Sequence, residues 1–250
     1  MALHRFYLPP TQWMAKLPVL DTADSHHCAE VLRLGLGGQV TVFDGEGHEA
    51  SAEIVEMSRK QTRLSVGPAK TTAKPSCVIT LAQAVPKGKN MELVIQKAVE
   101  LGALKITPIL SERTIVRIED AAEALRKQER WQTIAIEACK QCGQNWLPEI
   151  ALPRKMPDFL SQLPKADLIL IASLQPRAKA IKAVLAEDWQ KRGTFPGSVI
   201  VMIGPEGDFT ADETAKMQAV GAIPITLGSI ILRTETAALY CLSVLSHELF

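Results

Sequence analysis

Apolar residues follow two different patterns along this chain of 250 residues, and the change between them divides the chain into two parts. Short runs that alternate apolar and polar residues fill the first part, as expected of strands with one face in a core. A hairpin turn at Asp44–Gly47 joins two of these runs, and Asp24 or Ser25 can cap a short helix that ends before Gly35. We therefore predict a small, mostly β domain over residues 1–70, of a size that suits a compact barrel. The predicted strands are 3–8, 39–43, 49–57 and 61–66.

The second part begins after a stretch rich in Gly, Pro, Lys and Thr, in which we place a linker at 71–76. From there on, the apolar runs are nearly continuous, as in strands buried on both faces of a sheet, and they alternate with segments of helical period. A strand at 77–84, a helix at 90–101 and a strand at 104–110 form a βαβ unit, which implies a parallel sheet. Residues 77–250 are thus predicted to form an α/β domain with a parallel sheet. The remaining expectations are strands at 168–172, 198–203 and 223–227, helices at 120–141, 178–189, 211–220 and 236–249, and an irregular segment at 142–166.

Composition restricts the class of protein without choosing a function. Hydrophobic residues make up 47% and charged residues 22% of the chain, which is ordinary for a soluble globular protein. No apolar run approaches the roughly 18–20 residues that a membrane span needs, and the N-terminus lacks the apolar core of a signal peptide. The five scattered cysteines indicate a reduced, cytoplasmic protein. The net charge of +1 gives no global field for nucleic acid, so such a partner would need a local basic patch.

Two glycine turns near the C-terminus are the first candidates for chemistry. The apolar run Val199–Ile203 ends in the turn Gly204–Gly207, and a helix begins near Thr210. Such a turn exposes backbone N–H groups and lets a ligand approach the chain closely. It matches neither the dinucleotide fingerprint nor the phosphate-binding P-loop, which disfavours a dinucleotide or a nucleoside triphosphate. On local pattern alone, it could equally be a plain strand-to-helix connection.

The second turn lies in Leu227–Thr236, where three aliphatic residues separate Gly228 from Arg233 and Glu235. An apolar loop at strand ends suits the face of an adenine ring, while its backbone N–H and C=O groups can read the ring edge. The alternative is loop packing beside a surface ion pair, which would contribute about 0–1 kcal/mol.

Together the two turns resemble the signature of a known family. Ile203-Gly-Pro-Glu-Gly207 and Leu227-Gly-x-x-Ile-Leu-Arg-Thr-Glu-Thr-Ala237 are similar to motifs of the bacterial 16S rRNA (uracil-N3)-methyltransferases, the RsmE-type enzymes of the SPOUT superfamily. The resemblance covers essentially the whole chain in order. Further matching stretches are Lys87-x-x-x-Met-Glu-x-x-Ile-Gln-Lys-Ala-x-Glu-Leu-Gly102, His4-Arg-Phe-Tyr and His26-His-x-x-x-Val-Leu-Arg33.

The resemblance implies a fold and a cofactor that periodicity does not show. The second domain would be a SPOUT domain with a trefoil knot, against the general rule that chains avoid knots, and the first would be a PUA-like β-barrel that helps to hold rRNA. The protein would be a homodimer with active sites at the subunit interface, acting on 16S rRNA of the small ribosomal subunit. The two turns would wrap S-adenosylmethionine through Ile203, Gly204, Pro205, Glu206, Gly207, Leu227, Gly228, Ile231, Leu232 and Thr236.

The implied reaction gives roles to charged residues near the turns. Methylation at N3 of uridine requires loss of the imide proton and in-line attack on a sulfonium methyl group, with both reactants held in position. Arg233 is our candidate for stabilising the negative charge on O2 or O4, and Glu235 could orient Arg233 or accept the proton, directly or through water. Glu206 could hydrogen-bond the ribose hydroxyls or cap the helix that follows it.

Four cations are candidates for contacts with rRNA phosphates: Arg5, Arg33, Lys87 and Lys89. Each of them could instead be an ordinary solvated surface charge.

The sequence departs from the family pattern at three places. Asp208 stands where a glycine is usual, so the first turn could be tighter or more acidic, and Ile230 occupies a position that is often basic. In Cys139–Asn145, a cysteine at 142 and a glutamine at 144 replace the serine and the arginine of a family stretch. The Cys139-x-x-Cys142 spacing has no second Cys or His pair, so we expect a structural role and no metal.

Two other classes of function stay open at this point. One is a SPOUT ribose 2′-O-methyltransferase or tRNA methyltransferase, which would share the knot and change the acceptor. The other is a non-catalytic RNA-binding protein of ribosome assembly that retains the fold.

Overall fold

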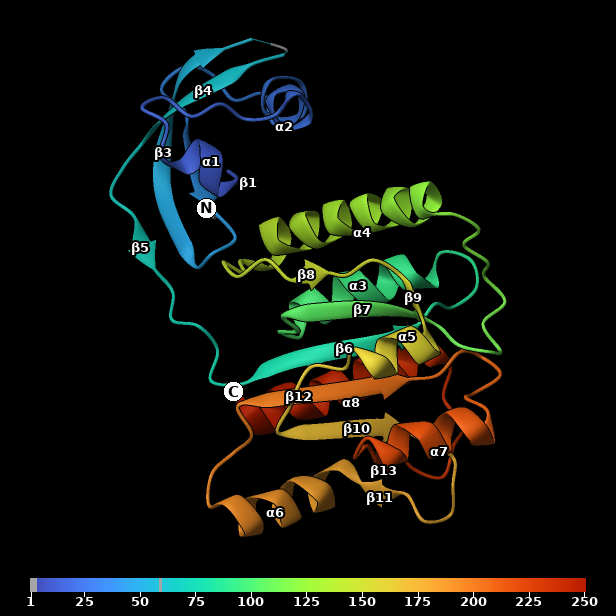
Figure 1. Ribbon diagram of the computed structural model, residues 1–250. Helices are drawn as coiled ribbons and strands as arrows, with labels where there is room; N and C mark the ends of the chain where they lie inside the picture. Colours follow the sequence, from blue (N-terminus) through green and yellow to red (C-terminus); the bar gives the residue numbers. More distant parts are fainter. Residues whose placement is uncertain (1–3, 59) are drawn as a thin grey trace. The chain divides into compact units, whose positions relative to one another are not determined.

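The computed structural model describes residues 4–58 and 60–250, and Figure 1 shows them coloured along the chain. The described residues group into two compact units, each with its own sheet and core. Unit 1 comprises the chain up to Lys74 together with Ile136–Leu147, and unit 2 comprises Pro75–Ala135 and Pro148–Phe250. The sequence pattern gives no sign that 136–147 groups with the first unit, because helical period continues without a break up to residue 141.

Unit 1 is built on a five-stranded sheet with the order β1-β2-β3-β4, in which β5 pairs with β3. β1 runs parallel to β2, and the other pairs are antiparallel. Alternate strand residues, among them Phe6, Val40, Ile54 and Leu64, are buried in one core, which explains the alternating pattern of the sequence. The predicted strands are confirmed to within two residues, and residue 3 lies outside the described chain. The elements are β1 (Arg5–Tyr7), α1 (Pro10–Trp13), α2 (Thr22–His26), η1 (His27–Val31), β2 (Gln39–Phe43), β3 (His48–Met57), β4 (Thr62–Val66) and β5 (Lys70–Thr71).

The helical segment of unit 1 begins earlier than predicted. The carboxylate of Asp21 accepts a 2.7 Å hydrogen bond from the backbone N–H of Asp24 and caps α2. A cap at Asp24 or Ser25 is therefore wrong, and both of these residues are buried inside the helix. α2 continues as the π-helix η1 and stops before Arg33, whose φ of 52° is left-handed.

Unit 2 is built on a single sheet with the order β11-β13-β10-β12-β6-β7-β8, and β9 also pairs with β7. All of these pairs are parallel, as predicted from the βαβ pattern. The elements are β6 (Val78–Ala84), α3 (Asn90–Glu100), β7 (Lys105–Leu110), α4 (Ala121–Cys142), whose last turns belong to unit 1, β8 (Glu149–Ile150), β9 (Arg154–Lys155), α5 (Met156–Ser161), β10 (Leu168–Ala172), β11 (Lys179–Ala180), α6 (Ile181–Arg192), β12 (Ser198–Ile203), α7 (Ala211–Ala219), β13 (Ile223–Thr226) and α8 (Thr234–Leu249).

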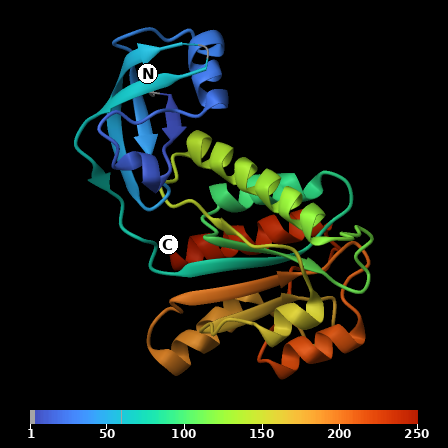
Figure 2. The same cartoon turned by 45° about the horizontal axis from the view of Figure 1, so that its top comes forward.

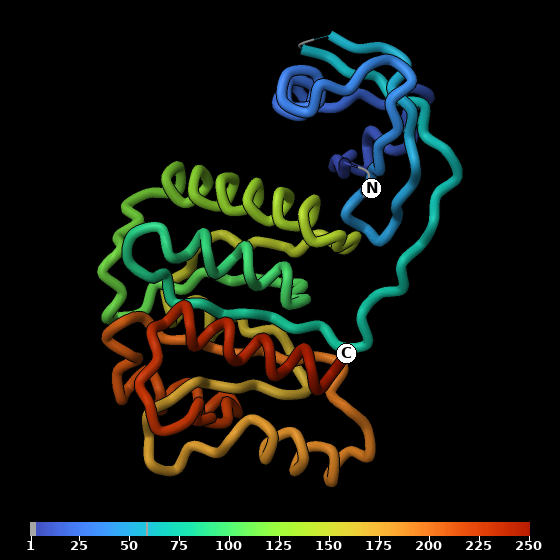
Figure 3. Tube along the Cα trace, turned by 180° about the vertical axis from the view of Figure 1, so that it is seen from behind, coloured from blue at the N-terminus to red at the C-terminus, as the bar shows by residue number. Residues whose placement is uncertain are grey.

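Helices cover both faces of this parallel sheet, as Figures 1, 2 and 3 show. On one face, α8 packs against α3 and against β6 and β12. On the other face, α5 and α7 bury Met156, Phe159 and Met217 in a core with the central strands. Since the strands are parallel, the carboxyl ends of β6, β10 and β12 meet at one edge of the sheet, where ligands bind in this class of fold.

Three expectations about unit 2 are corrected. The segment 142–166 is predicted to be irregular, but it contains β8, β9 and α5. Its two strands are only two residues long, and strands this short show no period in the sequence. α6 begins at Ile181 and not at 178, since the two residues before it form β11 beside β13. α8 begins at Thr234, two residues early, because Arg233 is the last extended residue before it. None of the helices in the described chain is both long and apolar enough to cross a membrane.

Candidate functional site

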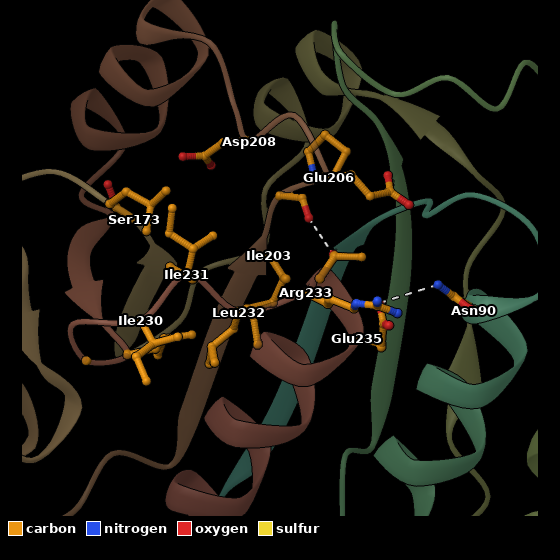
Figure 4. Close-up of a pocket in the computed structure, with 18 residues that line it drawn as sticks. Asn90, Ser173, Ile203, Glu206, Asp208, Ile230, Ile231, Leu232, Arg233 and Glu235 are labelled. Atoms are coloured by element: carbon orange, nitrogen blue, oxygen red, sulfur yellow. Dashed lines mark hydrogen bonds between the residues drawn. The ribbon is translucent and has the colours of Figure 1, made fainter.

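A pocket of about 480 Å³ opens at the carboxyl edge of the sheet in unit 2. Figure 4 shows how the residues after β12 and those before α8 face each other across it. The lining carries three carboxylates and one guanidinium, so its charge is negative. The lining residues are Asn90, Ala172, Ser173, Leu174, Ile203, Gly204, Pro205, Glu206, Asp208, Leu227, Gly228, Ile230, Ile231, Leu232, Arg233, Thr234, Glu235 and Ala237.

The turn after β12 is tight and requires a glycine at its first position. A Cβ at Gly204 would lie 3.0 Å from Oδ1 of Asp208 and 3.3 Å from the backbone nitrogen of Phe209. Asp208 closes the turn by donating its N–H to the carbonyl of Pro205 at 2.9 Å, and its φ of 58° is left-handed. Glycine adopts this conformation without strain, which explains why a glycine suits position 208. Here the aspartate carboxylate accepts a 2.8 Å hydrogen bond from the N–H of Phe209.

Glu206 ties this turn to the loop after β6. Its Oε1 accepts a 2.9 Å hydrogen bond from the backbone N–H of Lys87. The cap of α7 is Thr210, whose hydroxyl accepts from the N–H of Glu213 while the Glu213 carboxylate accepts from the N–H of Thr210. The alternative in which Glu206 caps α7 is therefore wrong.

The loop after β13 forms an apolar rim of the pocket. Gly228 has a φ of 114°, a conformation that other residues rarely adopt. Ile230 and Ile231 expose 75% and 76% of their surface, which is unusual for isoleucine. Figure 4 shows both at the side of the pocket opposite Asn90. These exposed aliphatic groups are available to a flat apolar ligand group.

A buried polar chain joins three segments behind the pocket. Nε2 of Gln83, at the end of β6, donates to the hydroxyl of Thr234 at 3.0 Å and also to the carbonyl of Ala84. The Thr234 hydroxyl donates in turn to the carbonyl of Gly204 at 2.6 Å. Gln83 and Thr234 expose only 0% and 5% of their surface. Buried hydrogen bonds of this kind fix the first residue of α8 against the turn after β12.

Arg233 and Glu235 both line the pocket, but they do not pair with each other. Glu235 accepts a 3.4 Å hydrogen bond from Nδ2 of Asn90, across the gap between α8 and α3. Within the described chain, the exposed guanidinium of Arg233 has no hydrogen bond or ion pair with another side chain. The surface ion pair that the alternative interpretation of this loop required is therefore absent from the described chain, and Arg233 is free to contact a ligand.

Most of the residues proposed from the sequence lie in this pocket. Gly207 sits beside it, where its carbonyl accepts from the Arg113 guanidinium at 2.7 Å, and Thr236 lies in α8 between the lining residues Glu235 and Ala237 without lining the pocket itself. Sequence reasoning missed the contribution of β10 with the residues after it and that of the first residue of α3. The rule that parallel strand ends share one edge could have indicated the residues after β10. The missed lining residues are Asn90, Ala172, Ser173, Leu174 and Ala237, whereas Asp208 and Ile230 were named only as departures from the family pattern and Thr234 only as part of the second turn.

The four cations proposed for RNA contact are divided between the two units. Arg5 lies in unit 1, where its guanidinium donates to Glu49 at 2.9 Å and to Asn145 at 2.7 Å, which favours a structural role. Arg33 is exposed in the same unit. Lys87 and Lys89 are exposed on the loop after β6, next to the pocket.

The cysteines show no arrangement that suits redox or metal chemistry. Burial raises the pKa of the Cys139 thiol to about 12, while Cys142 is exposed. Among residues 4–58 and 60–250, no group of three His, Cys, Asp or Glu side chains is placed to hold a metal ion.

Comparison with known proteins identifies the class of protein to which this fold and pocket belong. A family model described as an RNA methyltransferase domain matches residues 73–246, and one described as an RNA methyltransferase PUA domain matches residues 20–66. This chain belongs to the RNA methyltransferase family that these models define, as its motifs predicted.

The particular relatives share one name. The chain is 31% identical to ribosomal RNA small subunit methyltransferase E of Bacillus subtilis over 254 residues, which cover 98% of this chain and 97% of that protein. It is 32% identical to the protein of the same name from Synechocystis over 235 residues, 94% of this chain and 74% of that protein.

Two solved structures have the same fold. A Legionella pneumophila methyltransferase in complex with its cofactor SAM superposes with a TM-score of 0.88 at 34% identity, covering 99% of this chain and 98% of that one. Ribosomal RNA small subunit methyltransferase E from Neisseria gonorrhoeae, bound to S-adenosyl methionine, gives a TM-score of 0.84 at 31% identity with 98% of both chains covered.

Proposed function

We propose that this protein uses S-adenosylmethionine to methylate N3 of a specific uridine in the 16S rRNA of the small ribosomal subunit. The observation that carries the proposal is the pocket itself. Its two long walls are the two motifs that resemble the uracil-N3 methyltransferases, and they lie together although the nineteen residues 208–226 separate them. The relatives named ribosomal RNA small subunit methyltransferase E support the choice of substrate.

The residues of the pocket fit this cofactor. A cavity of about 480 Å³ lies within the range of about 300–1,000 Å³ typical of small-molecule sites. Ile231 and Leu232 offer an apolar surface for the adenine ring, and the turn at Gly204 admits close approach of a ligand to the backbone. The excess of carboxylates over cations in the lining favours a ligand that carries a sulfonium and an ammonium group.

The bound cofactor supplies an electrophilic methyl group on sulfur, and the protein supplies position and charge. Arg233 contacts O2 or O4 of the uracil, because its guanidinium lines the pocket and has no partner within the described chain. A cation there stabilises the negative charge that the ring gains when it loses the N3 proton. Glu235 takes that proton, directly or through water. Asn90, and not Arg233, holds the Glu235 carboxylate in place.

The architecture that we propose around this site follows the family. The segment 227–233 returns from β13 to the turn after β12, where Thr234 bonds Gly204, and this path supports a trefoil knot. The five-stranded sheet of unit 1 supports a PUA-like barrel over residues 1–70 that helps to hold rRNA, joined through a linker at 71–76 to the methyltransferase domain at 77–250. We further propose a cytoplasmic homodimer, in which the exposed isoleucines at 230 and 231 lie close to the second subunit.

Nucleoside mass spectrometry of rRNA from a deletion strain tests the proposal. The strain should lack one 3-methyluridine in 16S rRNA and regain it when the wild-type gene is returned. Loss of a 2′-O-methylated nucleoside instead would assign the chain to ribose methylation. If calorimetry detects no binding of S-adenosylmethionine, the remaining candidate is a non-catalytic RNA-binding protein of ribosome assembly.

A further inference from the structure

A second cavity of unit 2, of about 510 Å³, lies beside the cofactor pocket. It is formed by the loop after β6, the start of α3, Val116 and the first three turns of α4. The loop and the start of α3 lie between the two cavities, since Asn90, the first residue of α3, lines the first one while Gly88 and Lys89 line the second. The hydrogen bond from the Lys87 N–H to Glu206 fixes this loop in its position between them.

The second cavity has an apolar floor and a basic rim. Val85, Met91 and Trp131 form the floor, and all three are buried. Four cations on the rim exceed the two carboxylates, Glu92 and Glu123, by two charges; the cations are Lys89, Arg126, Lys127 and Arg130. The linings of the two cavities thus have net charges of opposite sign. The lining of the cofactor pocket is negative, and that of the second cavity is positive.

Two of the rim cations are available to a ligand. Arg130 pairs with Glu92 at 2.6 Å, and Lys127 lies 3.6 Å from Glu123. Within the part of the chain that the structure describes, the exposed side chains of Lys89 and Arg126 have no hydrogen bond or ion pair. Phosphate groups of nucleic acid bind to free cations of this kind and release their counterions in doing so.

A nucleotide combines the two chemistries that this cavity offers. A base can pack on the apolar floor, as bases do on apolar and aromatic platforms in single-strand sites, while its phosphate meets the basic rim. We propose that this cavity holds a nucleotide next to the target uridine, with its phosphate on Lys89 and Arg126. The inference rests on the proposed function, and it means that the rRNA strand crosses the loop after β6 to place one base in each cavity.

Filter binding of small-subunit rRNA to the full chain, with S-adenosylhomocysteine present, tests this site over a series of salt concentrations. Lys89→Ala and Arg126→Ala should each raise the Kd about three- to tenfold and make the log–log salt slope less negative by about one. Arg126→Glu should weaken binding further, and Arg126→Lys should recover most of it. Lys165→Ala is the matched control, because Lys165 is exposed before β10, at the opposite edge of the sheet.

The outcomes separate this site from the function it rests on. If Lys89→Ala and Arg126→Ala bind rRNA with the same Kd and slope as Lys165→Ala, the site is wrong. It is equally wrong if all three variants lose affinity alike, since general charge would then explain the loss. A wild-type chain that transfers no methyl group to small subunits would overturn the proposed function, while filter binding would still decide whether this cavity contacts RNA.

Discussion

The hydroxyl of Thr234 donates a 2.6 Å hydrogen bond to the backbone carbonyl of Gly204, and thereby joins the start of α8 to the turn after β12. Gln83 holds the same hydroxyl from β6. The two glycine turns are thus tied together, because three segments distant in sequence share a chain of hydrogen bonds.

Removing this hydroxyl should loosen the pocket without unfolding the protein. Thr234→Val keeps the shape and leaves one N–H of the buried Gln83 amide and the half-buried Gly204 carbonyl without a partner, which costs about 1–3 kcal/mol. We expect the Kd for S-adenosylmethionine to rise about tenfold, with Thr234→Ser within about threefold of wild type because the hydroxyl is restored. Calorimetry measures the affinity, and Thr133→Val, on the exposed side of α4, is the control. Equal affinity of the valine and serine variants would contradict the proposed contact.

Arg233→Ala should affect catalysis far more than cofactor binding. Loss of one donor that stabilises developing negative charge typically lowers kcat by about 10²–10³-fold, whereas the loop that we propose for the adenine ring is unchanged. Single-turnover methylation of small subunits gives the rate, and calorimetry gives the cofactor Kd. A rate within threefold of wild type would remove Arg233 from the mechanism.

Glu235→Gln tests the proton acceptor. The amide keeps the size of the side chain and can still bond Asn90, but it cannot accept the N3 proton, so we expect a loss of about 10²–10⁴-fold in the single-turnover rate. Asn90→Ala should lower the rate less, because it only frees the carboxylate from its 3.4 Å contact. If the glutamine variant stays fully active, the proton leaves by another route.

Only one of the five thiols should react quickly with a thiol reagent in the native protein. Burial raises the pKa of Cys28 and Cys77 to about 11 and that of Cys139 and Cys241 to about 12, so they stay protonated and covered at neutral pH. Cys142 is exposed. Titration should give one fast equivalent per chain, lost in Cys142→Ser, and five in denaturant. A second fast equivalent would show that one of the buried sites opens.

Acid should abolish the stabilisation that Glu49 provides to unit 1. The hydrogen bond from Arg5 lowers the pKa of Glu49 in the folded protein. A lowered folded pKa gives stability that is fully present above the unfolded value of about 4.3 and is lost as pH falls through the folded pKa. Thermal unfolding should therefore show a lower Tm for Glu49→Gln than for wild type at pH 7 and a shrinking difference below about pH 4. Glu53→Gln, exposed on the same strand, is the control, and a difference that does not change with pH would exclude this cause.

The sequence by itself determined most of the regular structure of both units. Strands such as Val78–Ala84 and Ser198–Ile203 are long enough for their apolar content to show, and the helix at Asn90–Glu100 has a clear period. The two glycine turns also stood out, because backbone geometry at Gly204 and Gly228 restricts the residue type. These features are local, and local rules can therefore find them.

Tertiary structure decided everything that joins distant segments. Gln83 and Thr234 are 151 positions apart, and Lys87 and Glu206 are 119 apart, so no local pattern could pair them. The same holds for Asn90, which takes the place beside Glu235 that the sequence had suggested for Arg233. Hydrogen bonds and charges act through space over a few ångströms, and only the folded sheet brings these side chains within that range.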